Sequence, residues 1–302
     1  MHEISYPFVS VIIPVYNDSE RLKLCLEALE NQTYSKKSYE IIVVDNASEE
    51  EIKSIVSQFS QTKYTYESQA GSYAARNKGL SIAQGKIIAF TDSDCIPTSS
   101  WIEKGVVCLQ SVPNCGLVAG RIDLFFQDSQ RPTAVELYES IAMGFPQKES
   151  LETDHFGVTA NLFTFKHVVN KVGDFNSSLK SGGDVEWGQR VFAAGYEQIY
   201  ADDACIAHPA RYSFSQLYKR IARIVGGRHD RMMSRDVSLI EIVIDLLETF
   251  KPPFRSFYRI WTNENLHTFK QKIQFNLVMF FVRYATISEK LRLYLGGNSK
   301  RA

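Results

Sequence analysis

The chain has 302 residues, of which 44% are hydrophobic, and its 34 basic side chains balance 34 acidic ones. This composition is typical of a packed globular protein and excludes a disordered chain. The charge is uneven: residues 1–210 contain 17 Lys and Arg and 27 Asp and Glu, whereas residues 211–302 contain 17 and 7. We therefore expect a main domain over residues 1–210 and a basic extension over residues 211–302.

Cysteine usage and hydropathy bear on the compartment. The five cysteines are scattered and form no C-x-x-C pair, which argues against a zinc site or a disulfide framework and favours a reducing cytoplasm. The N-terminus shows no signal-peptide pattern. The longest apolar run near the C-terminus, residues 277–282, is far shorter than the roughly 20 residues of a spanning helix. We expect a cytoplasmic protein.

Strand-like and helix-like segments alternate along the first 95 residues. Residues 8–14 are nearly all apolar, as in a strand covered on both faces. Leu22, Cys25, Leu26 and Leu29 then recur at helical spacing. Further strands are expected at 39–45, 64–66 and 86–90, and further helices at about 52–59 and 71–83. The rhythm predicts an α/β fold: a doubly wound, mostly parallel central sheet with flanking helices.

The second half of the domain is less regular. Residues 117–122 predict a strand, and residues 123–157 predict an irregular stretch. A β/α rhythm returns with strands at 161–165 and 197–201 and helices at 166–172 and about 185–194. From about residue 213 the pattern predicts a helical, basic C-terminal extension.

Polar residues stand at the carboxyl ends of these strands, where such sheets bind ligands. Asp92-Ser93-Asp94 places two carboxylates there, which suits a hard divalent cation that also holds phosphate oxygens. A D-x-D alone is a weak signal, because it also occurs in solvated turns that cap helices. Asp45 can accept the imide N–H of uracil, and Arg76 can reach a diphosphate or a base.

Four ordered motifs resemble the inverting family 2 glycosyltransferases of the GT-A fold, over about residues 8–210. The motifs are residues 11–17 (VIIPVYN), 42–48 (IVVDNAS), 71–79 (GSYAARNKG) and 90–94 (FTDSD). The resemblance implies a donor half at about 8–120 and an acceptor half at about 121–210. It also implies transfer of a hexosyl or N-acetylhexosaminyl group from a nucleotide-diphospho-sugar, with a UDP-sugar favoured.

The resemblance assigns the donor side residue by residue. By it, Pro14, Tyr16 and Asn17 contact the nucleotide, Asp45 reads the base, Arg76 assists the base or phosphates, and Asp92, Ser93 and Asp94 hold the ribose and metal. The family often has another acid directly after the D-x-D. Because that position is Cys95 here, we expect modest metal affinity.

The acceptor side resembles the family at residues 172–187. The family's Glu-Asp pair at a helix start corresponds to Gly183-Asp184, which implies that Asp184 is the general base that takes the proton of the acceptor hydroxyl. Glu186 is its expected substitute, and Trp187 and Asn161 are further acceptor-side candidates. The structural alternative for Asp184 is a helix cap.

His208 occupies the place where some relatives have a third metal ligand, beside Asp92 and Asp94. A shell of carboxylate and imidazole suits Mn²⁺ or Mg²⁺. The alternative is a structural histidine next to Pro209.

The C-terminal extension interleaves Lys270, Lys272 and Arg283 with aromatic and aliphatic residues over 266–287. This pattern predicts either an interfacial helix at the inner face of the plasma membrane, suited to a lipid-linked acceptor, or packing against the domain or a second subunit. No nucleic-acid module accompanies the charge, and the oligomeric state is open.

The predicted function is metal-dependent, inverting sugar transfer to a hydroxyl of a glycan or lipid-linked acceptor, in polysaccharide biosynthesis. A haloacid-dehalogenase-like phosphatase is an alternative, because residues 87–94 imitate its D-x-D strand and Asp202-Asp203 its late acidic pair. Three strand-like segments before the D-x-D argue against it. A catalytically silent nucleotide-sugar-binding protein is the third possibility, because Cys95 and Gly183 depart from the family pattern.

Overall fold

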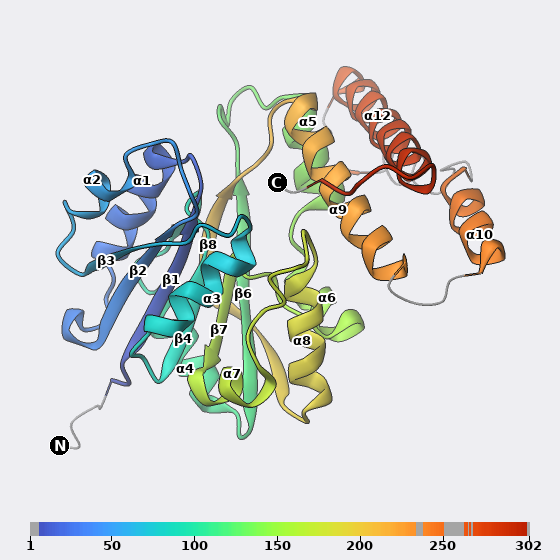
Figure 1. Ribbon diagram of the computed structural model, residues 1–302. Helices are drawn as coiled ribbons and strands as arrows, with labels where there is room; N and C mark the ends of the chain where they lie inside the picture. Colours follow the sequence, from blue (N-terminus) through green and yellow to red (C-terminus); the bar gives the residue numbers. More distant parts are fainter. Residues whose placement is uncertain (1–5, 234–237, 251–262, 265, 267, 301–302) are drawn as a thin grey trace. The chain divides into compact units, whose positions relative to one another are not determined.

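The computed structural model describes residues 6–233, 238–250, 263–264, 266 and 268–300 (Figure 1). The chain divides into two compact units. Unit 1 contains residues up to 123, residues 145–178 and residues 183–209, and unit 2 contains residues 124–144, 179–182 and those from 210 onward. Unit 2 therefore combines the C-terminal extension with two short earlier segments. The predicted domain boundary at residue 210 stays a prediction.

Strands and helices alternate along the described chain. The strands are β1 Val9–Val15, β2 Tyr39–Asp45, β3 Thr62–Tyr66, β4 Ile87–Thr91, β5 Ile96–Pro97, β6 Cys115–Phe125, β7 Asn161–Phe165 and β8 Glu197–Pro209. The helices are α1 Ser19–Glu30, η1 Lys36–Ser38, α2 Ile52–Val56, α3 Ser72–Ile82, α4 Trp101–Ser111, α5 Ala134–Tyr138, the π-helix η2 Glu139–Met143, α6 Gln147–Asp154, α7 Lys166–Val172, α8 Gly183–Ala193, α9 Phe214–Met233, α10 Leu239–Phe250 and α12 Phe269–Tyr294.

The strands form one sheet with the order β3-β2-β1-β4-β7-β6-β8-β5. Strands β1 to β4 pair in parallel, and register places Val15 beside Asp45 and Asp45 beside Tyr66. Strand β7 runs antiparallel to β4 and β6, and β5 antiparallel to β8. The predicted α/β fold with a helical C-terminal extension is confirmed. The parallel pairing covers the first four strands, whereas the later pairings just named are antiparallel.

Helices cover both faces of the parallel strands. On one face, alternate β1 residues such as Val11 share a core with Leu22 and Leu26 of α1 and with Trp101 of α4. On the other face, α3 packs on β1, β2 and β3. Its Gly79 lies so close to the sheet that a Cβ would be 2.5 Å from Ile12 Cγ2, so only glycine permits this approach.

Two segments differ from the sequence-based expectation. Residues 123–157 contain α5, η2 and α6 instead of an irregular stretch. Each of these helices is only 5 to 8 residues long, so the sequence shows no sustained helical period there. Strand β5 at Ile96–Pro97 is too short to show a pattern, and it forms through pairing with Ala207 and Ile206 of β8.

Unit 2 is a group of helices with its own core. Helix α12 packs against α9 and α5, and the shared apolar core includes Leu217, Ile221, Phe275 and Val278. Within the described residues, no helix combines the length and apolarity that crossing a bilayer requires.

A buried carboxylate joins the parts of unit 2. Glu139 of η2 is 0% exposed, and its Oε1 lies 2.8 Å from Arg220 Nη1 of α9. Its Oε2 accepts the backbone N–H of Arg211 at 3.0 Å and lies 3.3 Å from the Arg211 guanidinium. Burial acts to raise the pKa of Glu139, but the charges of Arg220 and Arg211 outweigh it, so the pKa lies below its ordinary 4.5.

We expect Glu139→Gln to destabilise unit 2 by about 3–5 kcal/mol, because it removes the anion that two guanidiniums share. A carboxyl with a lowered folded pKa stabilises the fold above its unfolded pKa, and this contribution is lost as pH falls through the folded value. Urea unfolding of the native chain should therefore show a loss of stability below about pH 4.5 that Glu139→Gln reduces. The exposed Glu149→Gln is the control; equal effects of both substitutions would contradict the role of Glu139.

Asn161 is a structural residue of unit 1. Its Oδ1 accepts the indole N–H of Trp101 at 2.8 Å, and its Nδ2 donates to the carbonyls of Arg121 and Ala204. The residue is 0% exposed. Asn161 therefore ties β7 to α4, β6 and β8, and its acceptor-side role stays a prediction.

We expect Asn161→Ala to lower the free energy of unfolding by roughly 3 kcal/mol, because it leaves buried donors and acceptors without partners. Asn31→Ala is the matched control, since the Asn31 amide donates to Glu27 O on the surface. Its expected cost is within about 0.5 kcal/mol. Urea denaturation followed by tryptophan fluorescence measures both, and comparable losses would refute the assignment.

Candidate active site

The carboxyl ends of β1, β2 and β4 bring together the polar residues that the sequence singles out. Asp45 is the last residue of β2, Asn17 follows β1, and Asp92 follows β4. These three strands pair in parallel, so their ends meet at one edge of the sheet. The edge also has a buried Pro14 and an exposed Tyr16.

Asn17 and Asp45 order the loop that follows β2. Asn17 has φ 47°, which an Asn side chain tolerates, and its Oδ1 accepts the Glu49 backbone N–H at 2.7 Å. Asp45 is buried: its Oδ1 accepts the Ser48 N–H, and its Oδ2 accepts the Tyr64 hydroxyl, both at 2.9 Å. A carboxylate oxygen can accept a second hydrogen bond, so these contacts orient Asp45 without exhausting it.

Asn46 is a site-forming residue that the sequence analysis missed. Its Nδ2 donates to the carbonyls of Glu67 and Gln69, and its Oδ1 accepts the Gly71 N–H at 2.7 Å. It therefore fixes the loop that leads into α3. The only available signal was an Asn directly after a strand, and that does not reveal a contact 25 residues away.

Arg76 of α3 reaches Asp92 across the edge of the sheet. Its Nη2 lies 2.5 Å from Asp92 Oδ1, and the Arg76 side chain is 4% exposed against 32% for Asp92. The Arg76 Nε is also buried and has no hydrogen-bond partner in the described structure. Most buried donors in folded proteins are hydrogen-bonded, so this Nε is an exception. The structure brings Arg76 and the D-x-D together.

Asp94 and His208 form the second contact at this edge. Asp94 Oδ2 lies 3.7 Å from His208 Nε2. His208 Nδ1 lies 2.8 Å from Pro209 O, and because a carbonyl can only accept, Nδ1 carries the proton. Nε2 is therefore the ring nitrogen that remains available to a metal ion, and it is the one near Asp94. This is the tautomer that a metal-binding histidine needs.

Cys95 lies beside this pair as a buried thiol. One ligand atom each from Asp94, Cys95 and His208 lie within 4.8 Å of one another. Burial, with the negative charges of Asp94 and Asp92, raises the pKa of Cys95 well above its ordinary value. Cys95 therefore stays a thiol that donates weakly to Asp94 Oδ1 at 3.8 Å. Sulfur is a soft ligand that suits Mn²⁺ or Mg²⁺ poorly, so the carboxylate and imidazole fit such an ion and Cys95 does not.

Asp18 is a further carboxylate at this edge, and the sequence analysis did not single it out as a site residue. Its Oδ2 accepts the Ser93 hydroxyl at 3.1 Å, and its Oδ1 lies 2.6 Å from Arg21 Nε. The Arg21 Nη1 also lies 3.7 Å from Asp94 Oδ2. Burial raises the pKa of Asp18 despite the opposing charge of Arg21. Asp18 thus accepts a hydrogen bond from the D-x-D through Ser93 and holds Arg21 near Asp94.

Asp184 lies in the first turn of α8. Its Oδ1 accepts hydrogen bonds from the Tyr73 hydroxyl of α3 at 3.3 Å and from the Val185 backbone N–H at 3.0 Å. Gly183 lies against the Tyr73 ring: a Cβ there would be 2.8 Å from two ring carbons. This contact is the physical reason why no Glu stands at position 183.

The other acceptor-side candidates are engaged in packing. Glu186 forms a two-pronged pair with Arg190, whose Nε lies 2.7 Å from Oε1 and whose Nη2 lies 3.0 Å from Oε2. Trp187 is 0% exposed, and its indole donates to Gly173 O. The structure thus shows Trp187 packed in the interior, and its acceptor-side role stays a prediction. Glu186 as a substitute base stays a prediction.

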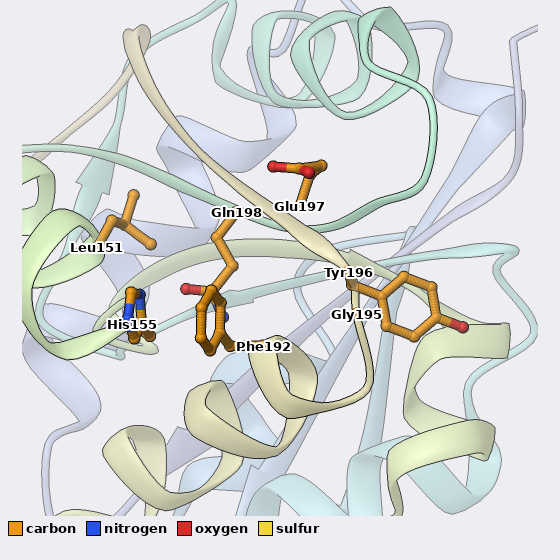
Figure 2. Close-up of a pocket in the computed structure, with 7 residues that line it drawn as sticks. All are labelled: Leu151, His155, Phe192, Gly195, Tyr196, Glu197 and Gln198. Atoms are coloured by element: carbon orange, nitrogen blue, oxygen red, sulfur yellow. The ribbon is translucent and has the colours of Figure 1, made fainter.

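A separate pocket lies at the other end of α8 (Figure 2). The rings of His155 and Phe192 stack in it, with centroids 3.6 Å apart and planes at 6°. Tyr196, Glu197 and Gln198 at the start of β8 also line it. None of the predicted site residues lines this pocket, so it is not the predicted donor site.

Residues 10–173, more than half of the chain, match the protein family described as glycosyl transferase family 2. The chain belongs to this family. As a family 2 glycosyltransferase it is similar to Glycosyltransferase AglE of Haloferax volcanii, with 41% identity over 238 residues that cover 77% of each chain. It is also similar to the pre-mycofactocin glycosyltransferase of Mycobacterium tuberculosis, with 30% identity over 72% of this chain and 46% of that protein.

A solved structure supports the same fold. The glycosyltransferase is similar to the mannosyltransferase PcManGT from Pyrobaculum calidifontis, solved in complex with GDP-Man and Mn²⁺. The TM-score is 0.65 at 16% identity, and the match covers 97% of this chain and 89% of the other. The predicted GT-A fold and the predicted enzyme class are therefore confirmed. The roles of individual residues stay predictions.

Proposed function

We propose that this glycosyltransferase transfers a sugar from a nucleotide diphosphate to an acceptor hydroxyl, with a divalent metal ion and with inversion at the anomeric carbon. The observation that carries the proposal is the arrangement at the carboxyl edge of the sheet. Arg76 pairs there with Asp92, and Asp94 lies beside the Nε2 of His208. Cationic and metal-binding groups stabilise the negative charge that develops on a diphosphate as it leaves.

On the donor side, we propose that the loops after β1 and β2 hold the nucleotide. Tyr16 and Asn17 supply the surface above the buried Pro14, and Asp45, oriented by Ser48 and Tyr64, reads the base. Uracil presents an imide N–H that a carboxylate can accept, but thymine and guanine present a similar donor, and only the family resemblance favours UDP. The structural neighbour binds GDP-Man, so GDP is the natural comparison.

We propose Asp94 and His208 as the metal ligands, with Mn²⁺ or Mg²⁺ as the ion. When bound, such an ion supplies positive charge against the leaving diphosphate. Asp92, also predicted as a ligand, has its Oδ1 paired with Arg76, and Ser93 donates to Asp18. We therefore propose that Asp92 and Ser93 contact the ribose and the phosphates.

On the acceptor side, we propose Asp184 as the general base. The acceptor oxygen forms a bond to the anomeric carbon as its proton passes to the Asp184 carboxylate. The bond from that carbon to the diphosphate oxygen breaks on the opposite face, and the nucleotide diphosphate leaves. One displacement inverts the anomeric configuration. We propose a glycan or lipid-linked glycan as the acceptor, within polysaccharide biosynthesis.

Thermal unfolding with nucleotides tests the donor site. We expect UDP with Mn²⁺, at about 100 times its dissociation constant, to raise the melting temperature by about 5 °C, because a ligand that binds only the folded state stabilises it. The same measurement with GDP, dTDP and CMP identifies the base, because the preferred nucleotide should raise the melting temperature most. Asp94→Ala should abolish the metal-dependent part of the rise.

Asp203→Ala is the matched control for this experiment. Its carboxylate is exposed and lies 4.0 Å from Lys104, and it should leave nucleotide stabilisation unchanged. It also tests the phosphatase alternative, in which the Asp202-Asp203 pair is essential. Stabilisation by no nucleotide, or phosphate release from phosphomonoesters that Asp203→Ala removes, would overturn the proposed function.

We further propose that α12 contacts an anionic lipid surface, as a lipid-linked acceptor would require. One face of α12 is buried through Phe275, Val278 and Met279, whereas the opposite face exposes a continuous apolar stripe. The stripe consists of Phe269, Ile273, Leu277, Phe280 and Tyr284. Residues 211–302 contain 17 basic and 7 acidic side chains, a charge that complements anionic headgroups.

Vesicle sedimentation tests this contact. We expect the protein to bind vesicles that contain phosphatidylglycerol, with weaker binding at high salt, and Leu277→Gln with Phe280→Gln to lower the partition coefficient at least about tenfold. Both side chains are half exposed or more, so the fold should tolerate the change. Val107→Gln on α4 is the control, since Val107 is equally exposed in unit 1. Unchanged binding of the double variant would refute the role of α12.

A further inference from the structure

Tyr73 occupies a buried position in the first turn of α3. Its side chain is 8% exposed, and its ring stacks on Phe175 with centroids 5.9 Å apart and planes at 24°. The ring also fills the space beside Gly183 where any larger residue would need room for a Cβ. Asn77, on the same helix, exchanges two hydrogen bonds with the backbone of Phe175. Helix α3 is therefore tightly tied to the segment that precedes α8.

The hydroxyl of Tyr73 points at the start of α8. It donates to Asp184 Oδ1 at 3.3 Å. Burial, followed by the negative charge of Asp184, raises the pKa of Tyr73 above its ordinary value. The phenol therefore keeps its proton at neutral pH and acts as a donor to the carboxylate.

The same ring faces the donor side of the site. The guanidinium carbon of Arg76 lies 5.8 Å from the centre of the Tyr73 ring, within the range of a cation–π contact. Tyr73 and Arg76 are three residues apart on one helix, so their side chains lie on one face. Arg76 in turn pairs with Asp92. One turn of α3 thus touches Asp184 through Tyr73 and the D-x-D through Arg76.

We propose that Tyr73 is a positioning residue for sugar transfer: it holds the Asp184 carboxylate in the orientation that accepts the proton of the acceptor hydroxyl. The inference rests on the proposed role of Asp184 as general base. In this role Tyr73 contacts the proposed general base, Asp184, and touches neither the donor nor the acceptor. The Tyr73 ring occupies the space beside Gly183, and a Glu side chain at position 183 would clash with that ring.

Tyr73→Phe tests the proposal, because it removes the hydroxyl and keeps the ring that packs on Phe175 and Gly183. We expect kcat to fall about ten- to hundredfold, the size of one hydrogen bond to a charged group, with an unchanged dissociation constant for the donor nucleotide by calorimetry. Tyr39→Phe is the matched control: Tyr39 is equally buried and donates to Leu29 O at 2.8 Å, away from the site. It should leave kcat unchanged.

A double-mutant cycle with Asp184→Asn separates positioning from packing. If Tyr73 acts through Asp184, Tyr73→Phe should cause no further loss of the residual single-turnover rate in the Asp184→Asn background. An equal loss in both backgrounds, or an unchanged kcat in Tyr73→Phe alone, would overturn the proposal. Full activity of Asp184→Asn would instead overturn the base assignment, and with it this inference, whereas absence of donor binding in the native chain would overturn the proposed function.

Discussion

The ion pair between Arg76 and Asp92 is the interaction on which the candidate site depends. The Arg76 side chain is almost fully buried, so its charge must be balanced within the protein, and the Asp92 carboxylate at 2.5 Å does this. Because the Asp92 carboxylate is partly exposed, breaking this pair should cost less than the roughly 3–5 kcal/mol typical of a fully buried pair. The pair therefore fixes helix α3 against the loop that follows β4, and the D-x-D is held in place before any ligand arrives.

Neighbouring loops are fixed by side-chain amides in the same way. The Asn17 side chain accepts a hydrogen bond from the loop after β2. The Asn46 side chain both donates to and accepts from the backbone of the loop before α3. Each bond joins segments about 20 to 30 residues apart, so the carboxyl ends of β1, β2 and β4 form one preorganised surface. Preorganised polar groups stabilise developing charge without the cost of reorienting during the reaction.

Two departures from the family pattern acquire a physical explanation. Cys95 is 0% exposed and belongs to the apolar core, so a carboxylate there would be buried beside Asp92 and Asp94 at a high electrostatic cost. Gly183 is required because the Tyr73 ring fills the space above it. Both departures are accommodated by packing, and they leave Asp94, His208 and Asp184 in place, so neither is a sign of a catalytically silent protein.

The sequence by itself determined the α/β alternation, the family resemblance and the strand ends that carry Asn17, Asp45 and the D-x-D, because apolar periodicity and short motifs are local properties of a chain. It did not reveal Asn46, Asp18 or Tyr73 as site-forming residues, and it placed Trp187 and Asn161 on the acceptor side although both are fully buried. Burial and partners depend on which segments the fold brings together. The pairing of Arg76 with Asp92 joins residues 16 positions apart, and the contact between Tyr73 and Asp184 joins residues 111 positions apart. Only the tertiary structure decides such contacts.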